Sequence, residues 1–168
     1  YVAVGNYLPH NLVFLDAETL EPLKILQTEG DAGVTSRVSA VYTAPTRNSF
    51  IAALKDLPEI WEIPYKTIAD KPTFEPRRIK LDDYLDDFFF NQSYSQVMGA
   101  ARPLDSGGKK SRIRGGLVID LDTGNRIAEL ALPGMPHLGS GITWQYQGRT
   151  VLASPNLSNG QVSVIDMD

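Results

Sequence analysis

Short apolar runs separated by polar turns recur along the whole chain. Leu12–Leu15 is an apolar run closed by the polar stretch Asp16–Thr19, and Leu117–Leu121 is closed in the same way by Asp122–Asn125. Turns that follow strands about every eight to twelve residues are typical of an all-β sandwich, barrel or propeller. Because no segment has a long 3.6-residue apolar period, we predict a nearly all-β chain.

Strands are predicted wherever an apolar or alternating run is bounded by turn residues. The predicted strands are 1–5, 12–15, 23–26, 37–43, 50–54, 60–63, 88–90, 97–101, 117–121, 127–130, 142–144, 150–153 and 162–165. The segment Tyr65–Asp87 receives no assignment, because it contains two prolines, a basic pair and two acidic pairs.

One strand pattern occurs four times. Leu12–Asp16, Leu117–Asp120 and Val162–Asp166 are apolar runs that end in aspartate, and Ile60–Ile63 is a weaker copy. Their first residues are 48, 57 and 45 residues apart, near the period of about 40 to 50 residues of a four-stranded propeller blade. We therefore predict a partial β-propeller of three to four blades. Since a propeller closes into a ring of about four to eight blades, we expect residues 1–168 to be a fragment of a single larger propeller domain.

The composition limits the class of protein without identifying a partner. With 168 residues and 42% hydrophobic content, the chain has the size of an ordinary globular domain. A net charge of −4 disfavours a nucleic-acid or polybasic membrane surface, and no apolar run is long enough to span a bilayer. The absence of cysteine excludes disulfides and the C-x-x-C-H attachment of a c-type haem within this chain. The first residue is not methionine, so we expect a processed product or an excerpt.

The most unusual stretch is Leu132–Trp144, LPGMPHLGSGITW. Two prolines and three glycines lie around His137; proline fixes φ, and glycine adopts backbone angles that other residues avoid. The stretch therefore predicts a shaped loop. An imidazole can bind a metal or move a proton near neutral pH, and the alternative is a histidine that only fills a turn. The residues alone leave both interpretations open.

Four other features are candidates for chemistry. Arg37 opens a small, apolar strand and Lys55 closes another, so each either binds a carboxylate or is solvated. The acidic cluster Asp82–Asp87 offers oxygen ligands for a hard cation, but it lacks the spacing of a calcium loop, and we favour a solvated acidic loop. His10 is interpreted as a surface turn residue. Ser140 lies in Gly-Ser-Gly, an incomplete form of the G-x-S-x-G nucleophile pattern.

Four segments carry a resemblance to a known family: residues 1–25, 36–63, 84–102 and 132–156. Together they resemble the haem d1-binding, eight-bladed propeller of the cytochrome cd1 nitrite reductase family. The segments LDDFFF and GMPHLGSGITW are the most specific, and they favour the c-type cytochrome branch of the family that acts in haem d1 biosynthesis. In that family the propeller follows a cytochrome c domain, which agrees with a chain that is an internal fragment.

The resemblance assigns positions to the residues of the distal site. The Pro-His loop of the family matches Pro136–His137, which implies that His137 lies at the distal face of haem d1 as an iron ligand or a proton acceptor. In the reductases a second distal histidine precedes the strand that matches Arg37–Ala40, and Asp31–Ser36 contains no histidine. The reductases also have an arginine shortly after the Pro-His pair, where this chain has Ser140. Both differences disfavour nitrite reduction.

The implied activity is that of an oxidoreductase of haem d1 biosynthesis. Such an enzyme converts dihydro-haem d1 to haem d1 by oxidising one propionate to an acrylate, and the electrons pass to a c-type haem outside this chain. Arg37 and Lys55 are the candidates for holding carboxylates of the macrocycle. The other candidate contacts of the macrocycle are Ser140, Trp144, Phe50 and Tyr94.

The resemblance also implies partners and a location. The expected partners are the tetrapyrrole substrate, haem c in an N-terminal domain, a c-type cytochrome or other electron acceptor, nitrite reductase and other proteins of haem d1 biosynthesis. The expected setting is denitrification in the periplasm, and the isolated fragment is not expected to be active. The alternatives are a cytochrome cd1-type nitrite reductase, a non-catalytic haem d1 carrier and a binding module of unrelated function.

Overall fold

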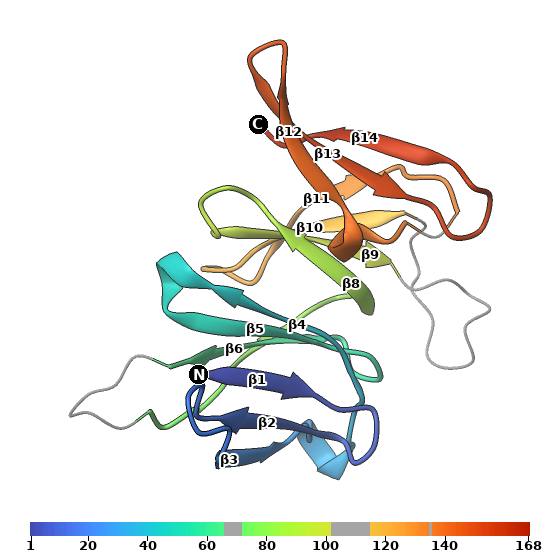
Figure 1. Ribbon diagram of the computed structural model, residues 1–168. Helices are drawn as coiled ribbons and strands as arrows, with labels where there is room; N and C mark the ends of the chain where they lie inside the picture. Colours follow the sequence, from blue (N-terminus) through green and yellow to red (C-terminus); the bar gives the residue numbers. More distant parts are fainter. Residues whose placement is uncertain (66–71, 102–114, 135) are drawn as a thin grey trace. The chain divides into compact units, whose positions relative to one another are not determined.

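The computed structural model describes residues 1–65, 72–101, 115–134 and 136–168, and these are mostly β-strands (Figure 1). The strands are β1 (Val2–Gly5), β2 (Asn11–Leu15), β3 (Pro22–Gln27), β4 (Val38–Ala44), β5 (Ser49–Leu54), β6 (Glu59–Pro64), β7 (Arg77–Lys80), β8 (Leu85–Phe90), β9 (Gln96–Ala101), β10 (Gly116–Asp120), β11 (Arg126–Leu130), β12 (Ile142–Tyr146), β13 (Arg149–Pro155) and β14 (Val162–Asp166). The short 3₁₀ turns are η1 (Asp31–Gly33), η2 (Pro45–Arg47) and η3 (Leu138–Ser140). The prediction of a nearly all-β chain is confirmed.

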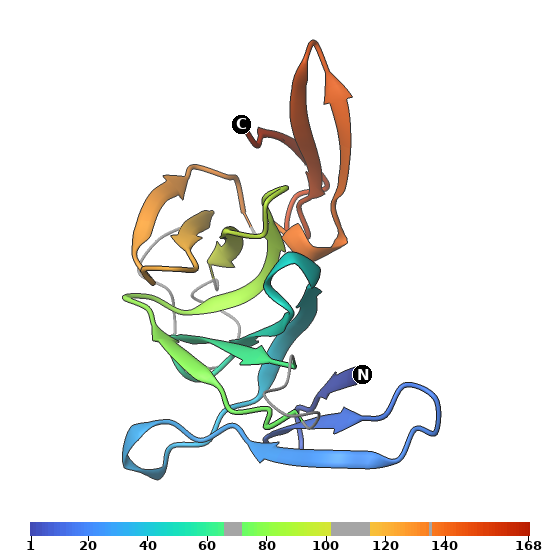
Figure 2. The same ribbon diagram turned by 90° about the vertical axis from the view of Figure 1, so that its left-hand side faces the viewer.

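Neighbouring strands in the sequence are also neighbours in four antiparallel sheets (Figures 1 and 2). The sheets have the orders β1-β2-β3, β4-β5-β6-β7, β8-β9-β10-β11 and β12-β13-β14. Sheets of consecutive antiparallel strands are the blades of a β-propeller, so the predicted partial propeller of three to four blades is confirmed. The chain divides into two compact units, Tyr1–Tyr84 and Leu85–Asp168, with two sheets in each. That they belong to one larger propeller domain stays a prediction.

The repeated sequence pattern marks equivalent strands. Its four copies fall on β2, β6, β10 and β14, and each pairs with the strand that precedes it. The aspartate that ends the pattern also begins the same turn in two sheets. Asp16 Oδ1 accepts the N–H groups two and three residues later, both at 2.9 Å, and Asp120 Oδ1 does so at 3.1 and 2.7 Å. The aspartate therefore caps the turn after each of these strands.

β7 is a strand that the sequence pattern did not predict. Of its four residues only Ile79 is buried. Its arginines instead bind carboxylates of β6: Arg77 Nη2 lies 2.6 Å from Glu62 Oε2, and Arg78 Nη2 lies 2.6 Å from Glu59 Oε1. Besides the buried pair of Ile79 with Ile60, cross-strand ion pairs thus hold β7 in the sheet, and a hydrophobic pattern does not detect them.

Each unit has its own apolar core. In the first unit the core is aromatic: Phe14 and Phe74 stack with ring centroids 4.4 Å apart, and Phe50 and Trp61 are buried beside them. In the second unit one core cluster joins Met98 of β9 and Leu152 of β13 to Leu138 of η3. Leu138 directly follows His137, so this core fixes one side of the loop that carries the histidine.

Candidate functional site

The loop between β11 and β12 is tied to the second unit on both sides of His137. The His137 N–H donates to the Pro155 carbonyl at 2.9 Å, and Pro136 pairs with Asn156 in an isolated β-bridge. The next side chain, Leu138, is fully buried. Backbone contacts before the histidine and core packing after it fix the backbone that carries the imidazole. This agrees with the shaped loop that the prolines and glycines of the stretch predict.

A buried amide holds the beginning of the same loop. The side-chain nitrogen of Asn156 donates to the Pro133 carbonyl, and Asn156 Oδ1 accepts the N–H of Ser158 at 3.0 Å and its hydroxyl at 2.9 Å. Gly134 lies against this amide with φ at +58°, and a Cβ there would come within 2.6 Å of Asn156 Oδ1. The loop therefore requires glycine at position 134 for both conformation and space.

Asp87 of β8 brings a carboxylate to the His137 imidazole. Asp87 Oδ2 accepts the Gly139 N–H at 2.7 Å and lies 3.3 Å from His137 Nδ1, while Asp87 Oδ1 accepts the Phe88 N–H at 2.9 Å. The Asp87 side chain is 10% exposed and that of His137 is 42% exposed. A carboxylate beside Nδ1 favours a proton on that nitrogen, and in the neutral ring the lone pair is then on Nε2. A half-exposed imidazole of this kind can bind a metal or accept a proton.

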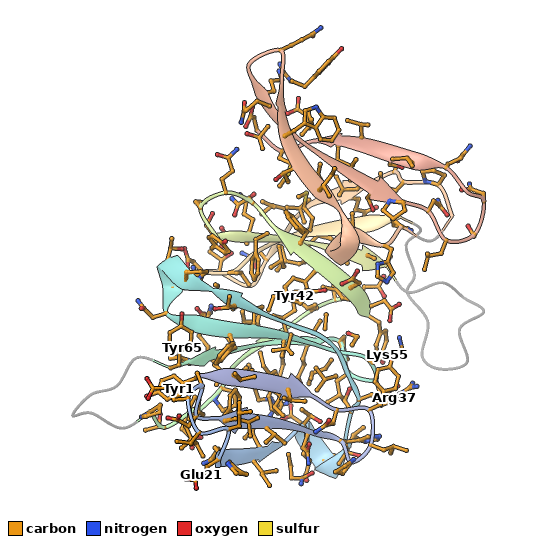
Figure 3. All side chains as sticks on the ribbon, in the orientation of Figure 1. Tyr1, Glu21, Arg37, Tyr42, Lys55 and Tyr65 are labelled. Atoms are coloured by element: carbon orange, nitrogen blue, oxygen red, sulfur yellow. The ribbon has the colours of Figure 1, made fainter. Side chains whose placement is uncertain are left out.

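The first unit contains a separate cationic cluster. Arg37 donates from Nε and Nη2 to the two carboxylate oxygens of Asp56, at 2.8 and 2.7 Å. The Lys55 N–H donates to the Arg37 carbonyl at 2.8 Å, and the Tyr7 ring centroid lies 5.4 Å from Arg37 Cζ and 5.7 Å from Lys55 Nζ. Figure 3 shows Arg37 and Lys55 beside each other. The structure thus brings together the two cations that were predicted separately.

Comparison with known proteins identifies the family. The sequence profile of the cytochrome D1 heme domain matches residues 1–168. The chain belongs to this family. It is 50% identical over 167 residues to a dihydro-heme d1 dehydrogenase of Pseudomonas aeruginosa, a match that covers 99% of this chain and 31% of the relative. The chain therefore spans about a third of the length of that protein, and the resemblance predicted from its segments is confirmed.

Two solved structures of other proteins are similar to this chain. The structure of the dihydro-heme d1 dehydrogenase NirN in complex with DHE is 49% identical, with a TM-score of 0.84 over 98% of this chain and 33% of that one. The β-propeller domain of Cps50 (Swd1) from Myceliophteria thermophila is 12% identical, with a TM-score of 0.63 over 99% of this chain and 53% of that domain. The second similarity concerns the fold alone.

The structure corrects the interpretation of the acidic cluster. Asp82 is exposed, but Asp83 and Asp87 are buried, so the cluster is not a solvated loop. Asp87 is instead the carboxylate partner of His137, a role that the sequence analysis missed. The signal that was available is LDDFFF itself, where two charged residues interrupt an otherwise apolar strand. Among the residues that the structure describes, no three ligands of the His, Cys, Asp or Glu type gather into a metal site.

The remaining predicted residues lie in different surroundings. Phe50 is buried in the core of the first unit, where its ring lies 5.0 Å from that of Tyr65, so packing explains it without a ligand. Trp144 lies on β12, a strand whose residues are all exposed, and pairs with Val151. Tyr94 packs against Phe90 with ring centroids 5.0 Å apart. Of Ser140 the structure gives only its backbone position, at the end of η3.

His10 behaves as a turn residue of the first unit. Its Nδ1 lies 2.8 Å from Thr35 Oγ1 in an exposed contact, and its carbonyl accepts the Thr28 N–H at 3.1 Å.

In the described part of the chain no helix is long and apolar enough to cross a membrane.

Proposed function

We infer that this chain is the part of a haem d1-type propeller that binds dihydro-haem d1 and oxidises one of its propionates to an acrylate. The observation that carries the proposal is His137, a half-exposed imidazole whose Nδ1 lies 3.3 Å from the buried carboxylate of Asp87, which also accepts the N–H of Gly139 in the same loop. The 50% identity to a dihydro-heme d1 dehydrogenase supports the substrate and the reaction.

The reaction defines what the protein has to supply. Conversion of a propionate to an acrylate forms one carbon–carbon double bond and releases two protons and two electrons. A bound tetrapyrrole supplies the reacting side chain and, through its iron and conjugated ring, a route for the electrons to an oxidised c-type haem or other acceptor outside this chain. We assign to His137 the distal side of the macrocycle, where its imidazole binds the iron or takes one of the protons.

Carboxylate binding is assigned to the cationic cluster of the first unit. Lys55 is the better candidate, because its ammonium lies over the Tyr7 ring and its backbone N–H is bound to the Arg37 carbonyl. The guanidinium of Arg37 already makes a two-point contact with Asp56, so its main effect is to hold this cluster in place and keep the local charge positive. For Ser140 and Trp144 we keep the prediction of macrocycle contact.

The wider setting follows from the same proposal. We propose that the natural protein adds a haem c domain, passes electrons to a periplasmic c-type cytochrome or similar acceptor, and delivers haem d1 to nitrite reductase during denitrification. A nitrite reductase activity of this chain is disfavoured, because η1 and the residues up to Ser36 contain no histidine to match the second distal histidine of the reductases.

The test uses the protein at its natural full length. Dihydro-haem d1 is supplied with an oxidised electron acceptor, and the absorption spectrum is followed. We expect a shift to the spectrum of haem d1 for the wild type, and a loss of about 100-fold or more in turnover for His137→Ala, as removal of a general base or metal ligand produces. His10→Ala is the matched control and should turn over as the wild type does. If the wild type binds the tetrapyrrole without converting it, the carrier alternative replaces the dehydrogenase.

A further inference from the structure

We propose that Asp87 is a positioning residue for His137: its carboxylate fixes the ring orientation and the tautomer of the imidazole and ties both to the backbone of the loop. The chemistry that follows rests on the proposed function, but the positioning itself concerns only residues of this chain. This role explains why LDDFFF has an aspartate at position 87, which neither the fold nor the family assignment explains.

The strand geometry that aims Asp87 is irregular. Leu85 of β8 pairs with Ala101 of β9, and Phe88 pairs with Gly99, so three steps on β8 are matched by two steps on β9. The extra residue forms a β-bulge at Asp86 and Asp87. A bulge redirects the side chains next to it, and bulges are frequent beside functional sites. Here it turns an acidic side chain of a buried strand towards the loop after β11.

The contacts of Asp87 require a carboxylate. Its two oxygens face two backbone N–H groups, from Phe88 and Gly139, and the Nδ1 side of His137. Every one of these groups can donate, and a carboxylate can accept from all of them. An asparagine has the same shape, but its NH₂ group would face a donor on one side. The arrangement therefore selects aspartate by hydrogen-bond polarity rather than by size.

The consequence for His137 is a defined tautomer. When the Nδ1 that faces the Asp87 carboxylate at 3.3 Å carries the proton, the neutral ring has its lone pair on Nε2, and the same carboxylate also accepts the N–H of Gly139, two residues along the loop. Ring and loop cannot shift independently. Carboxylate partners of ligand histidines act in this way, and their removal costs about 10- to 100-fold in metal affinity or activity.

The first experiment needs no ligand. Nitrogen-15 NMR of the histidine rings in the full-length protein, at a pH where the imidazoles are neutral, reports the tautomer, and the His137→Ala variant assigns the signal. We expect His137 to be protonated on Nδ1 in the wild type and to become a mixture of tautomers in Asp87→Asn. Asp83→Asn, a change at another buried aspartate of the acidic cluster that also accepts the N–H of its next residue, should leave the His137 signal unchanged.

The second experiment tests coupling during turnover. We expect Asp87→Asn to lower kcat by about 10- to 100-fold with a change of less than about threefold in tetrapyrrole Kd, and Asp87→Glu to recover part of the loss. If Asp87 acts through His137, the double variant Asp87→Asn/His137→Ala is no slower than His137→Ala. Unfolding midpoints of all variants identify any that fail to fold. If Asp87→Asn fails to fold, Asp87→Glu takes its place in the comparison.

The outcomes separate this proposal from the proposed function. An unchanged His137 tautomer in a folded Asp87→Asn protein, or losses that multiply in the double variant, would overturn the positioning role. If the wild type fails to convert dihydro-haem d1 while the tautomer still depends on Asp87, the positioning role stands and the dehydrogenase assignment falls.

Discussion

At the scale of single residues, two copies of the same turn differ in how well their residue suits the backbone. Leu20, after β2, has a φ of 59°, and Gly124, in the equivalent place after β10, has a φ of 76°. Both donate their N–H to the carbonyl of the turn aspartate, at 3.0 and 2.8 Å. The left-handed conformation costs a residue other than glycine about 1–2 kcal/mol. Leu20 is therefore strained where Gly124 is not.

Relief of this strain should stabilise the protein. In Leu20→Gly the gain is partly offset by the greater chain entropy of glycine, so we expect the free energy of unfolding to rise by about 0.5–1 kcal/mol in urea titration. Leu20 is 62% exposed, so little apolar burial is lost. Leu157→Gly, at a turn leucine that is 60% exposed without a positive φ, should lower stability, as should Gly124→Leu. A Leu20→Gly protein that is less stable than the wild type would contradict the interpretation.

Residues whose partners are close in sequence were predictable, and those with distant partners were not. The turns Asp16–Thr19 and Asp122–Asn125 were predicted from their polar residues, and in the structure Asp16 and Asp120 each bind the backbone two and three residues later. Asp87 and His137 are fifty residues apart, and the bulge that aims the carboxylate depends on pairing with β9. Sequence pattern could locate the histidine loop but could not name the carboxylate beside it.

At the scale of elements, charged pairs add to a single apolar pair, Ile79 with Ile60, in holding β7. The Glu62 carboxylate of β6 accepts hydrogen bonds from Arg47 Nε at 2.7 Å and from Arg77 Nη2 at 2.6 Å. Burial acts to raise the pKa of the Glu62 carboxyl, but the hydrogen bonds and charges of these arginines outweigh it, so the pKa lies below its usual value of 4.5. β7 was missed because RRIK has one apolar residue, whereas β8 to β10 were predicted from runs such as Phe88–Phe90.

The lowered pKa of Glu62 gives a pH dependence of known sign. A carboxyl whose pKa is lower in the folded state contributes stability that is fully present above the unfolded pKa, near 4.5, and is lost as the pH falls through the folded pKa. We expect Glu62→Gln to lose about 2 kcal/mol at pH 7, from charged hydrogen bonds that are removed, and to approach the wild type at pH 3.

Urea unfolding at a series of pH values measures this effect. Glu75→Gln is the control, because Glu75 pairs with Lys24 at 3.3 Å on the exposed surface, and such pairs contribute less than about 1 kcal/mol. A difference between Glu62→Gln and the wild type that does not change from pH 7 to pH 3 would mean that packing, not charge, is lost in the variant.

At the scale of the whole molecule, the last sheet has one face without a partner among the residues described. Ile142 and Val164, aligned across Ala153 of β13, are 68% and 61% exposed. The opposite face of the same sheet contributes Leu152 and Ile165 to the core of the second unit. A sheet that is apolar on both faces is typical of a blade between two others, and the relatives are about three times as long as this chain.

Charged substitutions on that face can distinguish whether the last sheet is a terminal sheet or an internal blade of a larger propeller. We expect the isolated 168-residue chain to self-associate, and Ile142→Lys/Val164→Glu to raise its monomer fraction in sedimentation velocity, because the exposed apolar face is then broken by charge. In the full-length protein the same pair should instead lower the unfolding midpoint, since further blades would bury both positions. Gln147→Lys/Gln161→Glu makes the same charge changes at exposed polar positions beside the strands and should do neither. If the double variant at 142 and 164 leaves the full-length protein as stable as the wild type, this face is a true surface and residues 1–168 are not an internal part of one propeller domain.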